Sequence, residues 1–161
     1  MLGKDLQLSG KTVRAQRPKR LPTVLTKDEA LKVIGCMSNR TQLMAKLLYG
    51  SGLRLTECVQ LRVKDLDFAQ RQILVRDGKG AQDRITMLPR SLVEPLQIYL
   101  KRIKLLHEQD LADGYGSTYL PYALARKYPN ADRQWPWQYV FPSSRISPDK
   151  ESGVLRRFHT R

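Results

Sequence analysis

The residues best suited to chemistry lie in the run 50–57, GSGLRLTE, where a glycine-rich turn leads back into a helical pattern. Arg54 is a lone arginine between two leucines in this run. A guanidinium fixed beside a helix start can grip a phosphate, because its rigid fork matches two non-bridging oxygens and free backbone N–H groups add donors. The alternative is a surface cation that caps the preceding helix. Arg54 is therefore the first candidate for phosphate chemistry.

The composition points to a polyanionic partner. The 161 residues are 41% hydrophobic, which argues against disorder, and carry a formal net charge of +14. A chain this basic most often binds nucleic acid, with an acidic membrane surface as the second possibility. No run approaches the ~18 consecutive apolar residues of a membrane span, and the N-terminus lacks the apolar core of a signal peptide. We therefore expect a cytosolic protein.

Three helices are expected before residue 65. Thr26-Lys27-Asp28-Glu29 has the form of a capping box and predicts the first. Thr41 is expected to open the second, which ends at Gly50 and Gly52. A short third helix follows Arg54, with Thr56 as a plausible cap. Its expected inward-facing residues are Cys58, Val59 and Leu61.

The two cysteines give no sign of a metal site. Cys36 and Cys58 lack metal-ligand spacing and lie among apolar residues. We therefore expect two buried free thiols rather than a disulfide, and no bound metal.

From Asp65 the apolar period becomes strand-like and predicts a small three-stranded antiparallel sheet. The positions that carry this period are Leu66, Phe68, Ile73, Val75, Ile85, Met87 and Leu88. The run 77–81, DGKGA, carries strong hairpin-turn signals and places Lys79 at the tip. A second capping box, Ser91 to Glu94, then predicts a long helix that keeps Pro95 in its first turn and ends near Leu106.

Aromatic and basic residues alternate through residues 107–142. Aromatic rings mixed with cations suit base stacking combined with phosphate contact, which is how single-stranded or extruded bases are held. The alternative is that the rings close a small core, and for any one ring that structural role has more weight. Residues 1–22 read as a basic inter-domain linker that tracks DNA, or alternatively as a solvated tail.

Taken together, three stretches resemble one family. The chain resembles a tyrosine recombinase, and specifically an integron integrase, in GLRLTE at 52–57, in GKG at 78–80 and in the segment 107–142, which we call the aromatic insert. The runs RPKRLP at 17–22 and YLPYALARKYP at 119–129 also resemble that subfamily. The resemblance covers nearly the whole chain.

The resemblance implies metal-free and cofactor-free cleavage of DNA through a 3′-phosphotyrosine. Arg54 would neutralise charge on the phosphorane, and Lys79 would protonate the departing 5′ oxygen as a general acid. Glu57 would orient Arg54, while Lys64 and Arg84 would be phosphate contacts. The alternatives are an exposed turn lysine at 79 and a solvated basic face at 64 and 84.

For the insert, the resemblance implies a surface that holds bases extruded from a folded, single-stranded recombination site. The residues expected there are Tyr128, Trp135, Pro136 and Trp137. The implied partner is DNA, in folded single-stranded or hairpin form and without a membrane. The intact family member would act as a tetramer on the bacterial nucleoid, moving gene cassettes.

The expected organisation is an α+β fold that forms part of a tyrosine-recombinase catalytic domain. It would comprise the linker at 1–22, the first part of the catalytic domain at 23–106, a mostly helical insert at 107–142 and a truncated continuation at 143–161. The family's H-x-x-R box and nucleophilic tyrosine have no assigned match here, so the chain reads as an inactive fragment. Two alternatives are a non-enzymatic DNA-binding remnant of an integrase gene, and a basic RNA-binding module. The last explains the charge but not the pairing of Arg54 with Lys79.

Overall fold

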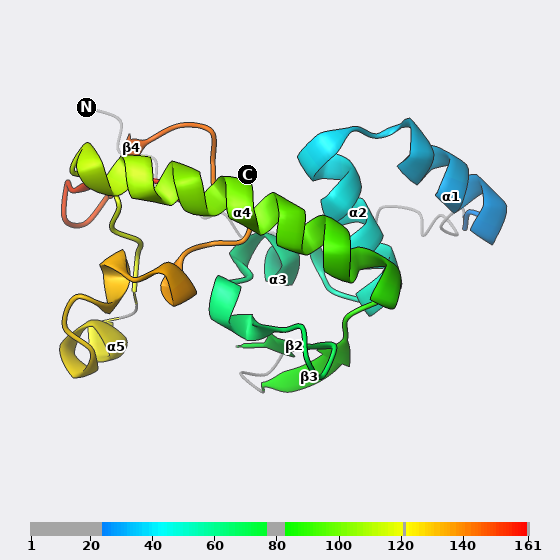
Figure 1. Ribbon diagram of the computed structural model, residues 1–161, viewed down its shortest axis with the longest axis horizontal. Helices are drawn as coiled ribbons and strands as arrows, with labels where there is room; N and C mark the ends of the chain where they lie inside the picture. The colour runs from blue at the N-terminus through cyan, green and yellow to red at the C-terminus, as the bar shows by residue number, and fades with distance from the viewer. Residues whose placement is uncertain (1–23, 77–82, 121, 161) are drawn as a thin grey trace, which may run out of the picture.

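One long helix runs across the molecule, with the first two helices near one of its ends and the small sheet beside it (Figure 1). The computed structural model describes residues 24–76, 83–120 and 122–160. The elements of the first half are α1 Lys27–Cys36, α2 Asn39–Ser51, α3 Leu55–Gln60, η1 Val63–Asp65, β1 Leu66–Asp67, β2 Gln72–Val75 and β3 Arg84–Met87. The second half contains α4 Arg90–Ala112, α5 Tyr122–Lys127, η2 Ala131–Arg133, η3 Trp135–Trp137, β4 Ser147–Pro148 and β5 Leu155–Arg156. This is the mixed, mostly helical class that the sequence predicts.

The capping residues explain where the early helices begin and end. The Thr26 capping box is confirmed, because Glu29 N–H donates to Thr26 Oγ1 and Thr26 N–H donates to the Glu29 carboxylate. Helix α2 begins at Asn39, ahead of the expected Thr41, and ends as predicted at Gly52 in the left-handed conformation, φ 63°. Thr56 was wrong as a cap. It lies inside α3, whose N-cap residue is Arg54.

The sheet has the strand order β1-β2-β3, and both strand pairs are antiparallel. On β2, Ile73 and Val75 point into the core as expected. On β3 the alternation runs the other way: Ile85 and Met87 are 64% and 67% exposed. Thr86, on the opposite side of that strand, donates to the Ser51 carbonyl at 2.7 Å and ties the sheet to the end of α2. The sheet therefore keeps an apolar outer face.

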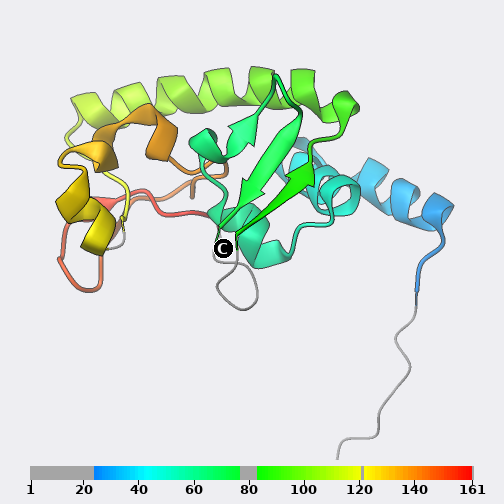
Figure 2. The same cartoon turned by 90° about the horizontal axis from the view of Figure 1, so that it is seen from below.

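Helix α4 supplies one wall of the core through a stripe of leucines. Leu92, Leu96 and Leu100 recur every four residues and are buried. They meet residues from α2, α3 and the sheet, together with Val140 and Phe141 from the far side of the insert. Figure 2 shows α4 running over the sheet at one end and over the insert at the other. The core thus joins the two halves of the chain.

The start and the end of α4 differ from the predictions, and so does the exposure of Cys36. The helix starts at Arg90 after Pro89, so the Ser91 capping box is wrong, and Pro95 lies inside the helix. The helix also continues past Leu106 to Ala112. Both thiols are free, but only Cys58 is buried; Cys36, the last residue of α1, is exposed. Burial raises the pKa of the Cys58 thiol to about 12.

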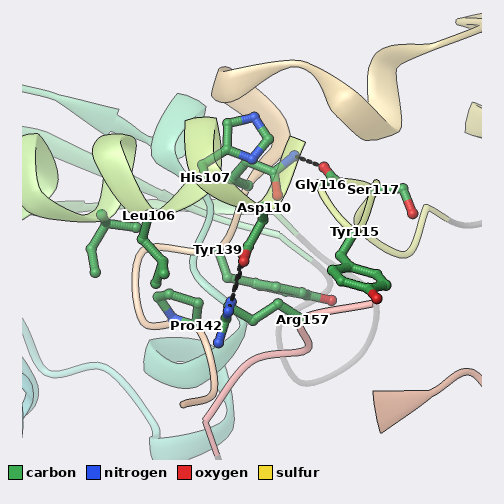
Figure 3. A pocket seen from close by; sticks show the side chains of 11 residues that line it. Leu106, His107, Asp110, Tyr115, Gly116, Ser117, Tyr139, Pro142 and Arg157 are labelled. Carbon is green, nitrogen blue, oxygen red and sulfur yellow. Dashed lines mark hydrogen bonds and ion pairs between the residues drawn. The ribbon is translucent and has the colours of Figure 1, made fainter. Parts of the chain in front are cut away.

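The C-terminal segment is bound to the end of α4 by an ion pair whose acid, Asp110, is buried. Arg157 donates to Asp110 through Nε at 2.6 Å and Nη2 at 2.7 Å, a bidentate geometry (Figure 3). Its Nη1 also donates to the Ser143 carbonyl. A cavity of about 20 Å³ lies beside this pair, near His107 and Tyr115. The segment after the insert is therefore an integral part of the fold.

Candidate functional site

One compact group of charged side chains, which we call the charged cluster, consists of Arg54, Glu57 and Arg84. Arg54 caps α3, and Glu57 lies one turn later on the same face, so its carboxylate reaches back to the helix start. Glu57 accepts from the Arg54 backbone N–H at 2.7 Å and from Arg54 Nη1 at 2.8 Å. Arg84, the first residue of β3, donates Nη2 to the same carboxylate at 2.7 Å. One acid thus holds two guanidinium groups side by side.

The side chain of Glu57 in this cluster is buried, whereas the two arginine side chains remain accessible. The Glu57 side chain is 7% exposed, against 53% for Arg54 and 36% for Arg84. Burial opposes ionisation of Glu57, but its hydrogen bonds from Arg54 and the charges of Arg84 and Arg54 outweigh burial, so the pKa of Glu57 is lowered. The carboxylate therefore stays ionised at neutral pH. It presents the two arginines to solvent with a net positive charge.

Lys79 lies outside the described residues, so its proposed role stays a prediction. The strands on either side of it are described: β2 ends at Val75, which pairs directly with Arg84 at the start of β3. Arg84 therefore stands at the end of the sheet from which the connection carrying Lys79 leaves.

A groove of about 480 Å³ adjoins the charged cluster and shares Glu57 with it. One wall comes from η1 and β2, and the other comes from the segment 119–139. We call it the aromatic groove. Its lining is Glu57, Gln60, Leu61, Arg62, Lys64, Asp65, Leu74, Val75, Arg76, Tyr119, Leu124, Tyr128, Trp137 and Tyr139. Rings and cations are therefore concentrated in one hollow.

Lys64 and Trp137 face each other in this groove. The Lys64 ammonium lies 3.0 Å from the centre of the Trp137 ring, a cation–π contact between the two walls. Tyr128 extends the ring surface, with its centroid 6.0 Å from that of Trp137. Burial, together with the charges of Arg76 and Arg62, lowers the pKa of Lys64 to about 8 despite the opposing effect of Asp65. Lys64 therefore loses its charge at a lower pH than an ordinary lysine does.

Trp135 takes a different position from Trp137. It is half-buried, packs against the hydrophobic core, and has its ring centroid 6.0 Å from that of His107. Pro136 is exposed between the two tryptophans. The structure thus brings Lys64, Tyr128 and Trp137 together in the groove, but turns Trp135 toward the core. For Trp135 the geometry favours the structural alternative.

Sequence reasoning missed Arg62, Arg76, Tyr119 and Tyr139 as groove residues. Arg62 contacts the insert through main-chain oxygens, which every residue supplies, so no residue type signals its partners. Tyr119 and Tyr139 belong to the alternating aromatic and basic residues of 107–142, but no local pattern assigns them to a groove. Arg76 lies beside the predicted hairpin and donates to the buried Asp65 at 2.9 Å. The opposite charges of Asp65 and Arg76, eleven residues apart, are the one sequence feature that could have predicted this contact.

Two kinds of feature are absent from the parts of the chain that the structure describes. In residues 24–76, 83–120 and 122–160, no group of three or more His, Cys, Asp or Glu side chains is arranged to hold a metal ion. Over the same ranges, no helix combines the length and the apolar character needed to cross a bilayer.

Comparison with known proteins gives consistent matches. The family model described as Phage integrase family matches residues 23–161. An integrase/recombinase of Escherichia coli is 47% identical over 146 residues, which covers 91% of this chain and 43% of that protein. The tyrosine recombinase XerA of Thermococcus onnurineus (strain NA1) is 41% identical over 87 residues, or 52% of this chain and 31% of XerA. The chain therefore spans less than half the length of these curated relatives.

Among solved structures, the chain is similar to one described as the crystal structure of XerA recombinase. The identity is 32% and the TM-score is 0.46, and the match covers 58% of this chain and 34% of the other.

Proposed function

The chain belongs to the phage integrase family, and on that premise we propose that it serves site-specific DNA recombination of the tyrosine-recombinase type. The observation that carries the proposal is the charged cluster. Two accessible guanidinium groups are already held by one buried carboxylate in the protein without DNA. A metal-free phosphoryl transfer needs preorganised cations of this kind, because the phosphorane gains negative charge.

Each residue of the cluster has a distinct proposed role. Arg54 binds the non-bridging oxygens of the scissile phosphate and stabilises the charge that develops there. Glu57 orients Arg54 and does not transfer protons, since its bonds to both arginines keep it ionised. Arg84, which donates to the same carboxylate, is a second phosphate contact. Lys79 acts as the general acid for the departing 5′ oxygen. This assignment rests on the family resemblance alone.

The aromatic groove is proposed to hold a base extruded from a folded single-stranded or hairpin recombination site. Trp137 and Tyr128 offer ring faces for stacking, and Lys64 lies where the phosphate of an extruded nucleotide would pass. Pro136 borders this surface. The groove shares Glu57 with the charged cluster, so one DNA strand can reach both. Recognition of this kind reads shape rather than sequence.

The wider proposal follows the integron integrase resemblance. The substrates are gene cassettes, the intermediate is a 3′-phosphotyrosine, and the active assembly is a tetramer on DNA at the bacterial nucleoid. Residues 1–22 serve as the linker to a preceding domain, and residues 23–106 as the first part of the catalytic domain. Residues 107–142 form the base-holding insert, and residues 143–161 continue the catalytic domain. The alternative is a chain that binds DNA without cutting it, since the same cations and rings serve both functions.

A chimera tests the reaction class. Residues 23–160 replace the segment they match in the Escherichia coli integrase/recombinase, and recombination between two sites on a plasmid is measured. We expect the chimera to recombine, and Arg54→Gln within it to lower the rate by on the order of 10²–10³. The matched control is Arg102→Gln, which removes an exposed arginine from α4.

The outcomes separate the alternatives. Equal rates with and without Arg54→Gln would overturn the role of Arg54. A chimera that binds sites but does not recombine them would favour the non-enzymatic alternative.

A further inference from the structure

The two walls of the aromatic groove come from distant parts of the chain and need a connection. Part of it is backbone pairing: Val63 N–H donates to the Gln138 carbonyl at 3.0 Å, and Val140 N–H donates to the Leu61 carbonyl at 2.8 Å. Arg62 and Tyr139 face each other in this short antiparallel bridge. The bridge fixes residues 138–140, but it does not reach the tips of the groove, Trp137 and Tyr119.

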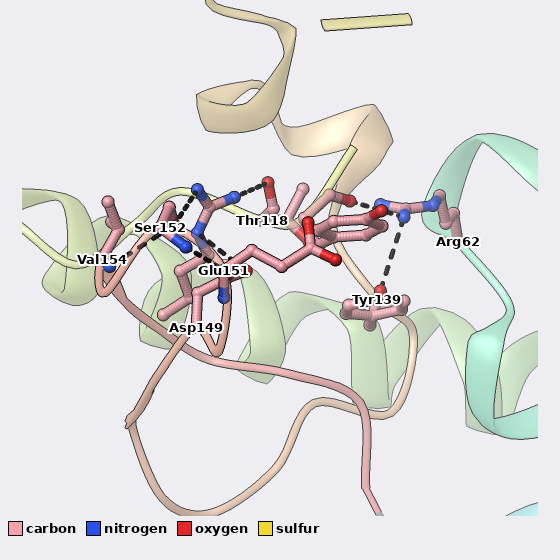
Figure 4. Close-up of polar contacts among 9 residues, drawn as sticks. Arg62, Thr118, Tyr139, Asp149, Glu151, Ser152 and Val154 are labelled. Carbon is pink, nitrogen blue, oxygen red and sulfur yellow. Dashed lines mark hydrogen bonds and ion pairs between the residues drawn. The ribbon is translucent and has the colours of Figure 1, made fainter. Parts of the chain in front are cut away.

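The Arg62 guanidinium supplies the missing connections. Its Nη1 donates to the Trp137 carbonyl at 2.5 Å, and its Nη2 donates to the Tyr119 carbonyl at 2.8 Å. The same group lies 4.6 Å from the centre of the Tyr139 ring, with Nη2 3.5 Å from the tyrosine oxygen (Figure 4). One side chain therefore contacts three residues that line the groove, and two of those contacts are charge-assisted hydrogen bonds to main-chain oxygens.

Arg62 is itself held in place from the core side. Its backbone N–H donates to Asp65 Oδ2 at 3.2 Å, and the other oxygen of this buried acid accepts from Arg76 Nε at 2.9 Å. The acid thus anchors the main chain of Arg62 and leaves its guanidinium to the insert. Lysine could not replace this group, because a single ammonium lacks the planar fork that reaches two carbonyls at once.

We propose that Arg62 is a positioning residue that sets the selectivity for extruded bases without contacting DNA. It fixes the Trp137 main chain, and so keeps that ring opposite Lys64, while it holds Tyr119 at the far side of the groove. This inference rests on the proposed function of the groove. Loss of the fork frees the rings from their fixed spacing, so the protein loses its preference for an unpaired base.

The test uses the 161-residue chain and fluorescence anisotropy with two labelled DNA hairpins. One hairpin carries a single unpaired purine and the other is fully paired. We expect Arg62→Lys and Arg62→Met to reduce the ratio of the two affinities by on the order of tenfold, within the range that one stacked base contributes. The slope of affinity against salt should stay unchanged in both, because Arg62 binds no phosphate. Arg102→Gln is the charge control and should keep the ratio.

Two results would overturn the proposal. If Arg62→Lys keeps the preference while Arg62→Met loses it, or if the salt slope falls by about one in Arg62→Met, Arg62 acts as a charge on the DNA. Trp137→Ala separates this failure from that of the groove itself. If Trp137→Ala keeps the preference, the proposed base-holding function fails; if it loses the preference and Arg62→Lys does not, only the inference about Arg62 fails.

A measurement without substitution covers the case in which a variant does not fold. In the unsubstituted chain with isotope-labelled arginine, NMR reports hydrogen exchange at the Arg62 guanidinium. We expect slow exchange that is the same with and without the bulged hairpin, since its partners lie within the protein. A marked change in the Arg62 signal on binding DNA, comparable with that of Arg54, would contradict the proposal.

Discussion

The charged cluster and the aromatic groove share Glu57 but are assembled over very different distances along the chain. In the cluster, Glu57 binds Arg54 three residues away, and only Arg84 comes from a separate element. In the groove, Arg62 bonds to residues 57 and 75 positions away. The cluster is therefore set by local helix geometry, whereas the groove depends on packing of the whole insert. The two sites should fail under different substitutions.

The largest effect is expected where the insert returns to the core. Phe141 is fully buried and its ring centroid lies 5.5 Å from that of Tyr99. Phe141→Ala should lower the free energy of unfolding by about 3–5 kcal/mol, because it leaves a cavity in the core that joins both halves. Urea unfolding measures this. Tyr128→Ala, an exposed ring, is the control, and a loss below about 1 kcal/mol for Phe141→Ala would show that the insert is fixed by other contacts.

The two tryptophans of the insert should separate stability from binding. Trp135→Ala should cost about 2–3 kcal/mol of folding free energy, less than a fully buried ring, and keep the preference for an unpaired base. Trp137→Ala should weaken binding to the bulged hairpin by about 1–3 kcal/mol, with a smaller change in stability. Urea unfolding and anisotropy are measured on both variants. The reverse pattern would place the stacking surface at Trp135.

Glu57→Gln should disturb the cluster and leave the groove preference intact. We expect a loss of about 1–2 kcal/mol in unfolding free energy, limited by the exposure of both arginines. The pKa of Glu57 is lower in the folded state, so its contribution is present above the ordinary pKa of 4.5 and is lost as the pH falls through the folded value. Urea unfolding at neutral and acidic pH should therefore show a smaller acid-induced loss in Glu57→Gln.

The control for this substitution is Glu108→Gln, an exposed acid on α4 whose nearest ion-pair distance is 4.0 Å. We expect it to change stability by less than about 0.5 kcal/mol. If Glu57→Gln also abolished the preference for an unpaired base, the cluster and the groove would not be independent.

The smallest effect concerns the charge on Lys64. The pKa of Lys64 is about 8, so raising the pH from 7 to 9 removes most of its charge and should weaken binding to the bulged hairpin by roughly 0.5–1 kcal/mol. Lys64→Met should show a smaller change over that range. The α-amino group also titrates near pH 8, but it is present in both proteins, so the difference isolates Lys64. Identical pH profiles would exclude Lys64 from the interface.

Local signals in the sequence predicted what local geometry determines. The Thr26 capping box, the turn at Gly52 and the antiparallel sheet each depend on a few neighbouring residues, and the structure contains all three. The Ser91 box failed because the chain already turns into α4 at Arg90. Cys36 was placed in the core by its apolar neighbours, yet α1 lies at the edge of the fold and leaves that side open to solvent.

The site divides in the same way. Arg54 and Glu57 are spaced for contact within one helical turn, so sequence alone could pair them. Arg62 could not be found, because hydrogen bonds to main-chain carbonyls leave no trace in residue type. The different surroundings of Trp135 and Trp137, only two residues apart, depend on how η3 meets the end of α4, which no local pattern specifies.

In the protein without DNA, Lys64 already occupies one face of the Trp137 ring, a surface on which a base could stack. An arriving base either stacks on the opposite face of Trp137 or displaces Lys64. In the second case the measured binding free energy is reduced by the lost cation–π contact, worth roughly 0.5–2 kcal/mol. The displaced ammonium is then available to the phosphate of the same nucleotide. In that second case, binding exchanges one partner of the Trp137 ring for another and does not fill an empty surface.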